Sequence, residues 1–365
     1  MVENRVLIAM SGGLDSSVAA YMLQQQGYDL VGITMKTWEY APGTNASESG
    51  CCSLDSINDA RSLAVSLGFP HYVLDLRDEF SKFIVSDFVD QYLKGRTPNP
   101  CVLCNTHIKW SALLKRADEL GCKYIATGHY ARIKEENDRY FVYKAADDNK
   151  DQTYVLWGLQ QDQLKRTLFP LGDYTKPDIK NIALQQGFKD IANKRESYEI
   201  CFVPDDDYRG FLKEQVPGLE ESVKEGVFVD IKGTVLGKHK GYPFYTIGQR
   251  KGLNIALGHP MYVKEIIPET NTIVLGEKKD LLSSKFYISG FNSMKYEKLP
   301  GPISALIKVR YKDKGTKGTL YPENNGLVRV ELDSPVNAVT PGQSAVAYEN
   351  NDLIGGGFIE VSVNK

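Results

Sequence analysis

The first half of the chain alternates short apolar runs with stretches of helical spacing. Residues 5–10 form an apolar run typical of a buried parallel strand, and residues 16–26 then carry apolar side chains at helical spacing. The alternation continues to about residue 215. It predicts further strands at 29–36, 71–75 and 124–127, and helices at 54–67, 79–93, 108–120, 176–186 and 206–215. Repeated strand–helix units predict an α/β fold with a doubly wound parallel sheet.

Two details of this half are specific enough to check. Within 79–93 the apolar spacing predicts an inward-facing set made of Phe80, Phe83, Ile84, Phe88 and Val89. Residues 132–144 are expected to form a hairpin that turns at Asn137-Asp138.

The pattern changes at about Val227, where helical periodicity ends. Short alternating runs follow, separated by Gly, Pro and Asn turns, and they predict a small β-rich module and then a C-terminal β-barrel. We therefore expect a catalytic domain at 1–215, a central β-rich module at 216–280 and the barrel at 281–365.

The turn between the first strand and the first helix carries the clearest chemistry. Its residues are Ala9, Met10, Ser11, Gly12, Gly13, Leu14, Asp15, Ser16 and Ser17. Glycines at such a turn permit positive φ and close approach, so backbone amides at the helix start can gather around a phosphate. Asp15 would repel a bare phosphate and is expected to act through Mg²⁺ or to orient the loop. The alternative is an ordinary glycine-rich turn with a capped helix.

Three residues near the ends of other strands are further candidates. Met35 ends the second strand, where it would line an adenine pocket or belong to the core. Gly128 follows the fourth strand at a point where a backbone could approach a nucleotide, and His129 is either a hydrogen-bond partner or a base.

Composition narrows the class of protein. The chain has 365 residues, of which 42% are hydrophobic and 25% charged, which suits two or three ordinary domains. Its apolar runs are too short for a membrane span, and Met1 leads directly into the first strand, so we expect a cytoplasmic protein without a signal peptide. The net charge of −2 argues against a generally basic nucleic-acid binder. Basic residues nevertheless gather in two local clusters, each of which is either a solvated strand face or a surface for a polyanion. The first comprises Lys232, Lys238, Lys240, Arg250 and Lys251, and the second comprises Lys308, Arg310, Lys312, Lys314 and Lys317.

The cysteines suggest thiol chemistry rather than structural disulfides, which are rare in the cytoplasm. Pro98 and Pro100 are expected to stop any helix, which leaves Cys104 just before the helix at 108–120, where the helix dipole favours a thiolate. The Cys101-x-x-Cys104 pair has no second CxxC to complete a zinc site. Cys201 lies between apolar neighbours and is either a buried inert thiol or a functional one.

Taken together, the motifs resemble the MnmA family of tRNA-uridine 2-sulfurtransferases (2-thiouridylases), within the N-type ATP pyrophosphatase (PP-loop) superfamily. The resemblance spans nearly the whole chain. Its motifs are Ser11-Gly12-Gly13-Leu14-Asp15-Ser16, Arg96-Thr97-Pro98-Asn99-Pro100, Cys104-Asn105, Thr127-Gly128-His129-Tyr130, Lys150-Asp151-Gln152, Ile200-Cys201-Phe202, Gly248-Gln249-Arg250-Lys251-Gly252-Leu253, Val309-Arg310-Tyr311 and Thr340-Pro341-Gly342-Gln343-Ser344.

The resemblance implies an adenine nucleotide alpha hydrolase-like domain that makes 2-thiouridine at the tRNA wobble position. It implies that ATP, with Mg²⁺, binds Ala9, Met10, Ser11, Gly12, Gly13, Leu14, Asp15, Ser16, Met35 and Gly128. It implies tRNA contacts by Asn99, Pro100, Cys101, Lys150, Asp151, Gln152, Arg310 and Tyr311. Cys201 would carry a persulfide, with Cys104 as its catalytic partner. The implied partners are tRNA with a wobble uridine and a persulfide sulfur-carrier protein or cysteine desulfurase, and the chain is expected to be a monomer without membrane association.

The chain departs from the family pattern at two places. Many members carry Asp where this chain has Cys101, so Cys101, Cys104 and Cys201 together could hold an iron–sulfur cluster. Tyr198-Glu199 replaces the Thr-Gly often found before Ile-Cys, and Cys51 and Cys52 are incidental or relay sulfur. Two other functions stay open: a PP-loop enzyme that adenylates a small substrate, and an inactive tRNA-binding relative.

Overall fold

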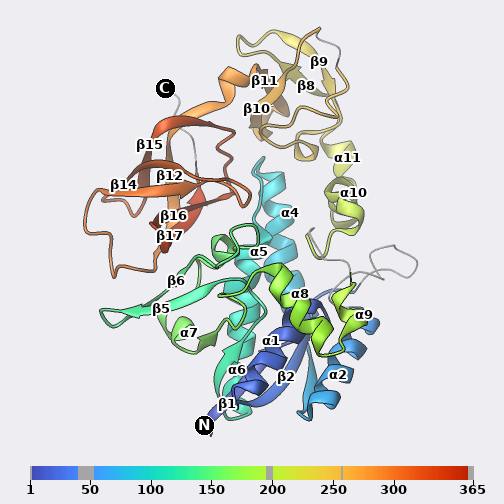
Figure 1. The fold of residues 1–365 in the computed structure, drawn as a ribbon. Coiled ribbons are helices and arrows are strands. Elements are labelled where there is room, and N and C mark those ends of the chain that lie inside the picture. Colours follow the sequence, from blue (N-terminus) through green and yellow to red (C-terminus); the bar gives the residue numbers. More distant parts are fainter. Residues whose placement is uncertain (1, 40–52, 195–199, 256–257, 361–365) are drawn as a thin grey trace. The chain divides into compact units, whose positions relative to one another are not determined.

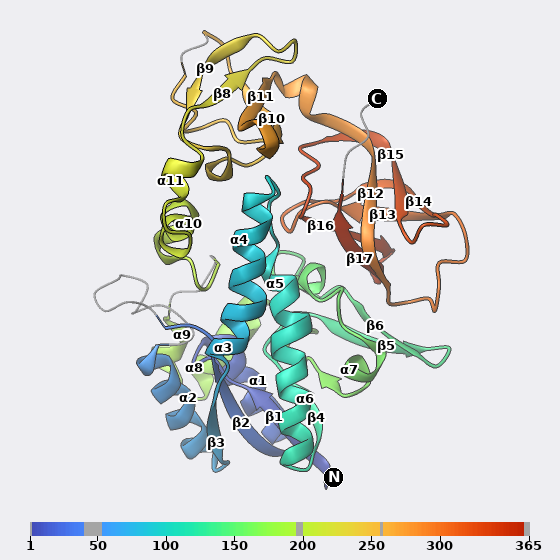
Figure 2. The ribbon, with the colours of Figure 1, turned by 180° about the vertical axis from the view of Figure 1, so that it is seen from behind.

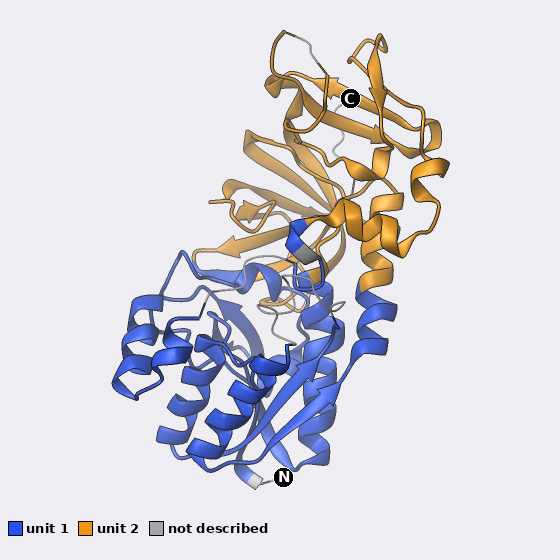
Figure 3. Ribbon diagram, turned by 90° about the vertical axis from the view of Figure 1, so that its right-hand side faces the viewer, with its two compact units in different colours: residues 1–84, 101–206, 351–353 blue, residues 85–100, 207–350, 354–365 orange. Residues whose placement is uncertain are grey.

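The computed structural model describes residues 2–39, 53–194, 200–255 and 258–360 (Figure 1). Cys51, Cys52, Tyr198 and Glu199 therefore lie outside the described residues. The chain divides into two compact units, each built from segments far apart in sequence (Figure 3). Unit 1 comprises Met1–Ile84, Cys101–Asp206 and Asn351–Leu353; unit 2 comprises Val85–Pro100, Asp207–Asn350 and Ile354–Lys365.

Unit 1 contains the predicted doubly wound sheet, with parallel strands in the order β3-β2-β1-β4-β7. Helices α1, α2 and α8 cover one face and α6 covers the other (Figures 1 and 2). The strands are β1 Val2–Ala9, β2 Asp29–Lys36, β3 His71–Asp75, β4 Cys122–Ala126 and β7 Thr167–Leu168. The helices are α1 Leu14–Gln25, α2 Leu54–Leu67, α6 Trp110–Glu119, α7 Gln161–Lys165, α8 Lys176–Gln185 and α9 Lys189–Ala192.

The strand order indicates where a ligand would bind to the sheet. Val6 and Ile8 of β1 join the core under α1 and α8, and this alternation fixes which face of β1 meets those helices. The chain goes from β1 to β2 and β3 on one side, and then returns to place β4 on the other side of β1. The carboxyl ends of β1 and β4 are therefore the switch point where such sheets bind ligands.

The helix predicted at 79–93 is interrupted by a wider turn. It consists of α3 Arg77–Phe80, a π-helical segment Ser81–Val85 and α4 Ser86–Leu93. The prediction that Phe83 faces inward is wrong, because its side chain is 51% exposed while Val85 is buried. A π turn holds an extra residue, so it rotates the following side chains relative to a regular helix.

The prolines before the next helix do not stop it. The helix begins with α5 Pro100–Leu103, continues through a π-helical segment Cys104–Lys109, and ends with α6. The prediction that Cys104 precedes a helix is therefore wrong. Proline is tolerated in the first turn, where its missing N–H has no intrahelical partner.

The hairpin and the C-terminal region match the sequence pattern. β5 Arg132–Glu136 and β6 Arg139–Tyr143 pair around Asn137 and Asp138, which both adopt positive φ. In unit 2 a small sheet has the order β10-β11-β8-β9, and β12-β15-β14-β13-β16-β17 closes into a barrel through the pairing of β12 with β17. The fold class is therefore confirmed. Strand β9 carries little apolar pattern, since its Val235 is 64% exposed.

The elements of unit 2 have the following bounds. The helices are α10 Tyr208–Gln215 and α11 Leu219–Ser222. The small sheet contains β8 Gly226–Val229, β9 Val235–His239, β10 Tyr262–Ile267 and β11 Thr272–Gly276. The barrel contains β12 Leu282–Ser293, β13 Ile303–Lys308, β14 Thr316–Pro322, β15 Val328–Asn337, β16 Ser344–Glu349 and β17 Asp352–Ile359. In the described part of the chain, every helix is too short or too polar to cross a membrane.

His239 is a buried neutral group in the small sheet. Its Nδ1 accepts a hydrogen bond from Gly241 N at 3.0 Å, and its ring packs on Phe228 and Tyr245. Burial lowers its pKa from 6.5 to about 4. Below pH 6.5 the unfolded chain therefore takes up a proton that the folded chain refuses, so stability falls as the pH drops from 6.5 toward 4.

Replacing His239 by glutamine is expected to reduce this pH-dependent loss of stability. The wild type should lose on the order of 2 kcal/mol of unfolding free energy from this group between pH 6.5 and 4, and His239→Gln should lose less over the same range. Urea unfolding at several pH values measures the slope. His259→Gln, at an exposed histidine, is the matched control. An unchanged slope in His239→Gln would contradict the assignment.

Candidate active site

The loop after β1 is fixed by its own side chains. Ser16 Oγ accepts a hydrogen bond from Ser11 N at 3.1 Å, lies 3.2 Å from Ser11 Oγ and donates to Gly13 O at 3.2 Å. Gly12 has φ +68°, and a Cβ there would lie 2.1 Å from Ser56 O of α2. Glycine is therefore required at position 12 for both its conformation and its space.

Two lysines from distant segments reach the same loop, Lys176 at the start of α8 and Lys194 just after α9. Lys176 Nζ lies 2.7 Å from Asp15 Oδ1, which also accepts a hydrogen bond from Tyr130 Oη at 2.8 Å. Lys194 Nζ donates to Gly12 O at 3.0 Å and pairs with Asp59. Asp15 is therefore held by partners from two segments far along the chain. Sequence reasoning missed Lys176 and Lys194, because a lysine far along the chain carries no signal of its own.

Gly128 lies against the loop, and Met35 lies near the carboxyl end of β2. A Cβ on Gly128 would lie 2.8 Å from Asp15 C and Ser16 N, so the missing side chain lets this segment pack directly on the loop backbone. Met35 is half-buried near the end of β2, opposite Leu74 of β3.

His129 is a poor base in this environment. Its Nδ1 is 2.7 Å from Thr127 Oγ1, and its ring packs near Trp110. Desolvation by the surrounding protein lowers its pKa to about 3, with Lys109 acting in the same direction. A group with so low a pKa accepts protons weakly at neutral pH, which favours the hydrogen-bonding interpretation.

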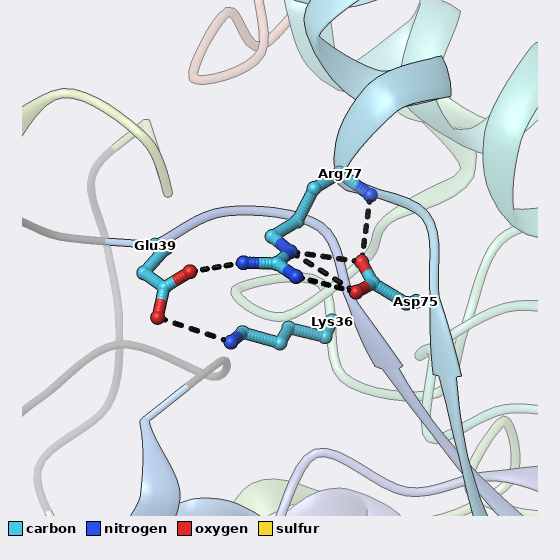
Figure 4. Close-up of polar contacts among 4 residues, drawn as sticks. All are labelled: Lys36, Glu39, Asp75 and Arg77. Carbon is cyan, nitrogen blue, oxygen red and sulfur yellow. Dashed lines mark hydrogen bonds and ion pairs between the residues drawn. The ribbon is translucent and has the colours of Figure 1, made fainter.

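Charged side chains fix the exposed ends of β2 and β3 (Figure 4). Arg77 Nη2 lies 2.6 Å from Asp75 Oδ2, and Glu39 bridges Arg77 to Lys36, whose Nζ lies 3.2 Å from Glu39 Oε1. The hydrogen bonds from Arg77 lower the pKa of Asp75 to about 2. The cluster therefore stays charged at neutral pH and holds the chain that leaves β2 beside Met35.

Cys201 is exposed, so the interpretation of a buried inert thiol is wrong. Its neighbour Phe202 is 1% exposed and packs on Trp38 and on Phe80 of α3, with ring centroids 6.0 and 5.4 Å apart. The buried ring anchors the segment and leaves the thiol at the surface.

Cys104 lies in the π-helical segment and is 7% exposed. The side chain of Asn105 donates to Val155 O at 2.9 Å, and Thr106 Oγ1 donates to Val102 O at 2.9 Å, which holds this segment in place. The segment packs against α3, the same short helix that Phe202 contacts through Phe80. The fold thus gathers both cysteine-bearing segments around α3.

The predicted iron–sulfur ligands do not form a cluster site. Across the described residues, which include Cys101, Cys104 and Cys201, no group of three or more His, Cys, Asp or Glu side chains is arranged to hold a metal ion. Cys101, Cys104, Cys122 and Cys201 are present as thiols. The residues therefore do not fit such a cluster.

The segments expected to contact tRNA differ in exposure. Asp151 is buried, and its carboxylate accepts from Ala145 N at 3.1 Å and from Thr153 Oγ1 at 2.8 Å. Gln152 Oε1 accepts from Tyr130 N at 2.9 Å. Both side chains thus shape the turn, which is followed by a single 3₁₀ turn Thr153–Val155. Lys150 is partly exposed, and Arg310 and Tyr311 of unit 2 are exposed.

Asn99 and Pro100 lie in unit 2, and Cys101 begins the next segment of unit 1. Asn99 Nδ2 donates to Ser344 Oγ at 3.2 Å, and Pro100 starts α5. The side chain of Cys101 is exposed. Desolvation by the surrounding protein raises the pKa of its thiol. Contacts of these residues with tRNA stay predictions.

Comparisons with known proteins cover almost the whole chain. Residues 4–205 match the family model described as the tRNA methyl transferase HUP domain, 209–277 the tRNA methyl transferase PRC-barrel domain, and 283–359 the aminomethyltransferase beta-barrel domain. The chain is 57% identical over 364 residues to tRNA-specific 2-thiouridylase MnmA of Amoebophilus asiaticus, covering 99% of this chain and 96% of that protein. It is 57% identical to the protein of that name from Cytophaga hutchinsonii, covering 99% and 98%, and 53% identical to that from Salinibacter ruber, covering 98% and 94%.

Proposed function

Because this chain belongs to the tRNA-specific 2-thiouridylase family, we propose that it converts the wobble uridine of tRNA to 2-thiouridine at the expense of ATP. Uracil C2 is a poor electrophile and its oxygen leaves badly. Attack of that oxygen on the α-phosphate of ATP releases pyrophosphate and turns the oxygen into part of AMP, a good leaving group.

The loop after β1 is proposed to bind the pyrophosphate portion of ATP. Its support is the fixed geometry of Ser11, Gly12 and Ser16, together with Lys176 and Lys194, which place positive charge next to the loop amides. Mg²⁺ would neutralise charge on the phosphates, and Asp15, the one carboxylate of the loop, would be its ligand there. The proposed site keeps the full predicted set from Ala9 to Ser16 with Met35 and Gly128.

Sulfur transfer is proposed to use Cys201 and Cys104. A persulfide on Cys201 attacks C2 with its outer sulfur, and AMP leaves with the former carbonyl oxygen. The Cys104 thiolate then attacks Cys201 Sγ, which breaks the sulfur–sulfur bond, releases 2-thiouridine and leaves a Cys104–Cys201 disulfide for an external thiol to reduce. The observation that carries this assignment is the gathering of both cysteine-bearing segments around α3, with Cys201 exposed to a donor.

Several features around this chemistry are part of the same proposal. The sulfur source is a persulfide carrier protein or cysteine desulfurase, and the enzyme works as a cytoplasmic monomer. The functional division is a catalytic domain at 1–215, a central module at 216–280 and a barrel at 281–365. Among the described residues no set of side chains is arranged to hold an iron–sulfur cluster, and iron and acid-labile sulfide should be absent from protein purified without oxygen.

The second basic cluster, which contains Lys308, Arg310, Lys312, Lys314 and Lys317, is proposed to bind tRNA phosphates. Lys308→Glu combined with Arg310→Glu should weaken tRNA binding by roughly 10–100-fold at moderate salt and lower the dependence of affinity on salt, because fewer counterions are released. Filter binding at several salt concentrations measures both. The control reverses two exposed lysines of unit 1, Lys180→Glu with Lys189→Glu. Unchanged affinity in the first variant would place the tRNA surface elsewhere.

A thiolation assay tests the function itself. Protein, ATP, Mg²⁺, a sulfur source and unmodified tRNA with a wobble uridine are mixed, and 2-thiouridine is measured after nuclease digestion. ATP-dependent product is expected. Folded protein that yields neither 2-thiouridine nor AMP would favour the small-substrate or binding-only alternatives.

A further inference from the structure

The peptide bond between Met10 and Ser11 lies just beyond the end of β1, and both of its polar groups are held by side chains. Met10 O accepts a hydrogen bond from Thr34 Oγ1 of β2 at 2.8 Å. Ser11 N donates to Ser16 Oγ of α1 at 3.1 Å. A peptide unit is planar, so bonds to its carbonyl oxygen and to its amide together fix the orientation of the whole unit. The entry into the loop that is proposed to bind phosphate is therefore oriented from two elements, β2 and α1.

A second strand supports the hydroxyl of Thr34. His71 of β3 places its Nε2 2.8 Å from Thr34 Oγ1. The hydroxyl has a single proton, which it donates to Met10 O, so it accepts from the ring and Nε2 carries the hydrogen. The other ring nitrogen, Nδ1, is buried and has no hydrogen-bond partner among the described residues. Burial, with Arg61 acting in the same direction, lowers the pKa of His71, so the ring stays neutral at pH 7 and keeps this arrangement.

The register of the sheet and a glycine let the ring reach Thr34. β2 and β3 are parallel, and His71 lies opposite Gly32 rather than Thr34. Gly32 and Thr34 are two residues apart on β2, so they share one face of the sheet. A Cβ on Gly32 would lie 2.9 Å from Met10 Sδ and 3.1 Å from His71 Cδ2, so the missing side chain makes room for both groups. Met10, Thr34 and His71 thus gather over one face of β2, all within unit 1.

We propose that Thr34, supported by His71, is a positioning residue for the ATP-dependent step: its hydroxyl orients the Met10–Ser11 peptide and thereby the backbone amides that follow in the loop. This inference rests on the proposed function, in which the loop binds the pyrophosphate portion of ATP. Thr34 is 1% exposed, so it acts through the loop and not by contact with ATP. Without the hydroxyl, the carbonyl of Met10 loses this partner, and the peptide can turn to find another one.

The test uses the full-length protein with Thr34→Val, which keeps the shape of the side chain and removes its hydroxyl. We expect the kcat of tRNA-dependent AMP formation, measured with labelled ATP, to fall by roughly 10–100-fold, because misplacement of about 1 Å has an effect of that size. KM for ATP and the affinity for tRNA should stay within about twofold, since the loss belongs to the transition state. Thr34→Ser, which restores the hydroxyl, should recover most of the rate.

Thr167→Val is the matched control, because Thr167 of β7 has the same kind of partners elsewhere in the same sheet. Its buried hydroxyl donates to Gln163 O at 2.7 Å and accepts from Trp110 Nε1 at 2.8 Å. Both variants remove a buried hydroxyl that links a ring N–H to a backbone carbonyl group, so a general loss of stability should affect them alike. Thr167→Val should nevertheless keep its rate of AMP formation, since these partners lie outside the loop.

The outcomes separate this inference from the proposed function. If the wild type forms AMP in the presence of tRNA and Thr34→Val keeps its kcat, the positioning role is wrong and the proposed function stands. A loss that appears only in KM for ATP, or equally in Thr167→Val, also contradicts the positioning role. Folded wild type that forms neither AMP nor 2-thiouridine would overturn the proposed function itself.

Thermal unfolding shows whether each variant is folded. Should Thr34→Val not fold, His71→Phe takes its place, because phenylalanine keeps a ring and removes the donor to Thr34. A fall in the kcat of AMP formation is expected for this variant too, and a wild-type rate would contradict the inference.

Discussion

Cys201→Ser is expected to abolish thiolation while leaving tRNA binding nearly intact. Serine keeps the shape of the side chain but cannot carry a persulfide, so the rate of 2-thiouridine formation should fall by at least about 10³-fold. The side chain is exposed and its neighbour Phe202 supplies the packing, so the fold should not depend on the sulfur atom. Nuclease digestion and nucleoside analysis measure the product.

The matched control is Cys122→Ser, at a buried cysteine of β4 with no proposed chemical role. It should keep its thiolation rate for as long as it stays folded. Substantial thiolation by Cys201→Ser would remove Cys201 from the mechanism. AMP formed by Cys201→Ser in a tRNA-dependent manner, without 2-thiouridine, would locate the defect after adenylation.

Gly12→Ala is expected to suppress the ATP-dependent step itself. The alanine Cβ would lie 2.1 Å from Ser56 O, and the residue would also have to adopt φ +68°. The loop must shift away from α2, and its amides no longer converge on the phosphates. We expect tRNA-dependent AMP formation to fall by roughly 100-fold or more, measured with labelled ATP.

Gly121→Ala is the control that distinguishes the effect of backbone strain from the effect of the steric clash at position 12. Gly121 has φ +69°, almost the same as Gly12, but a Cβ there would meet no atom within 4 Å. This variant should lose about 1 kcal/mol of stability from the left-handed conformation and keep its rate of AMP formation. If Gly12→Ala retained wild-type AMP formation, the loop would not be the pyrophosphate site.

The family and its chemistry were recognisable from local patterns. The loop Ser11–Ser16 combines residue types that recur because a phosphate site needs glycine conformations and nearby donors, and it lies between a strand and a helix as predicted. Strands β2 and β3 and helix α2 have the predicted bounds. Periodicity alone could not show the π turns, which displaced Phe83 and placed Cys104 inside a helix.

The sequence by itself determined the sheet and barrel classes, the loop proposed to bind phosphate and the candidate cysteines, because each depends on neighbours within a few residues. Only the tertiary structure decided what surrounds them. It brought Lys176 and Lys194 to the loop, gathered the Cys104 and Cys201 segments around α3, and set Thr34 between Met10 and His71. Such contacts join residues far apart in the chain, and no local spacing encodes them, since they arise only when strand order and packing bring distant segments together.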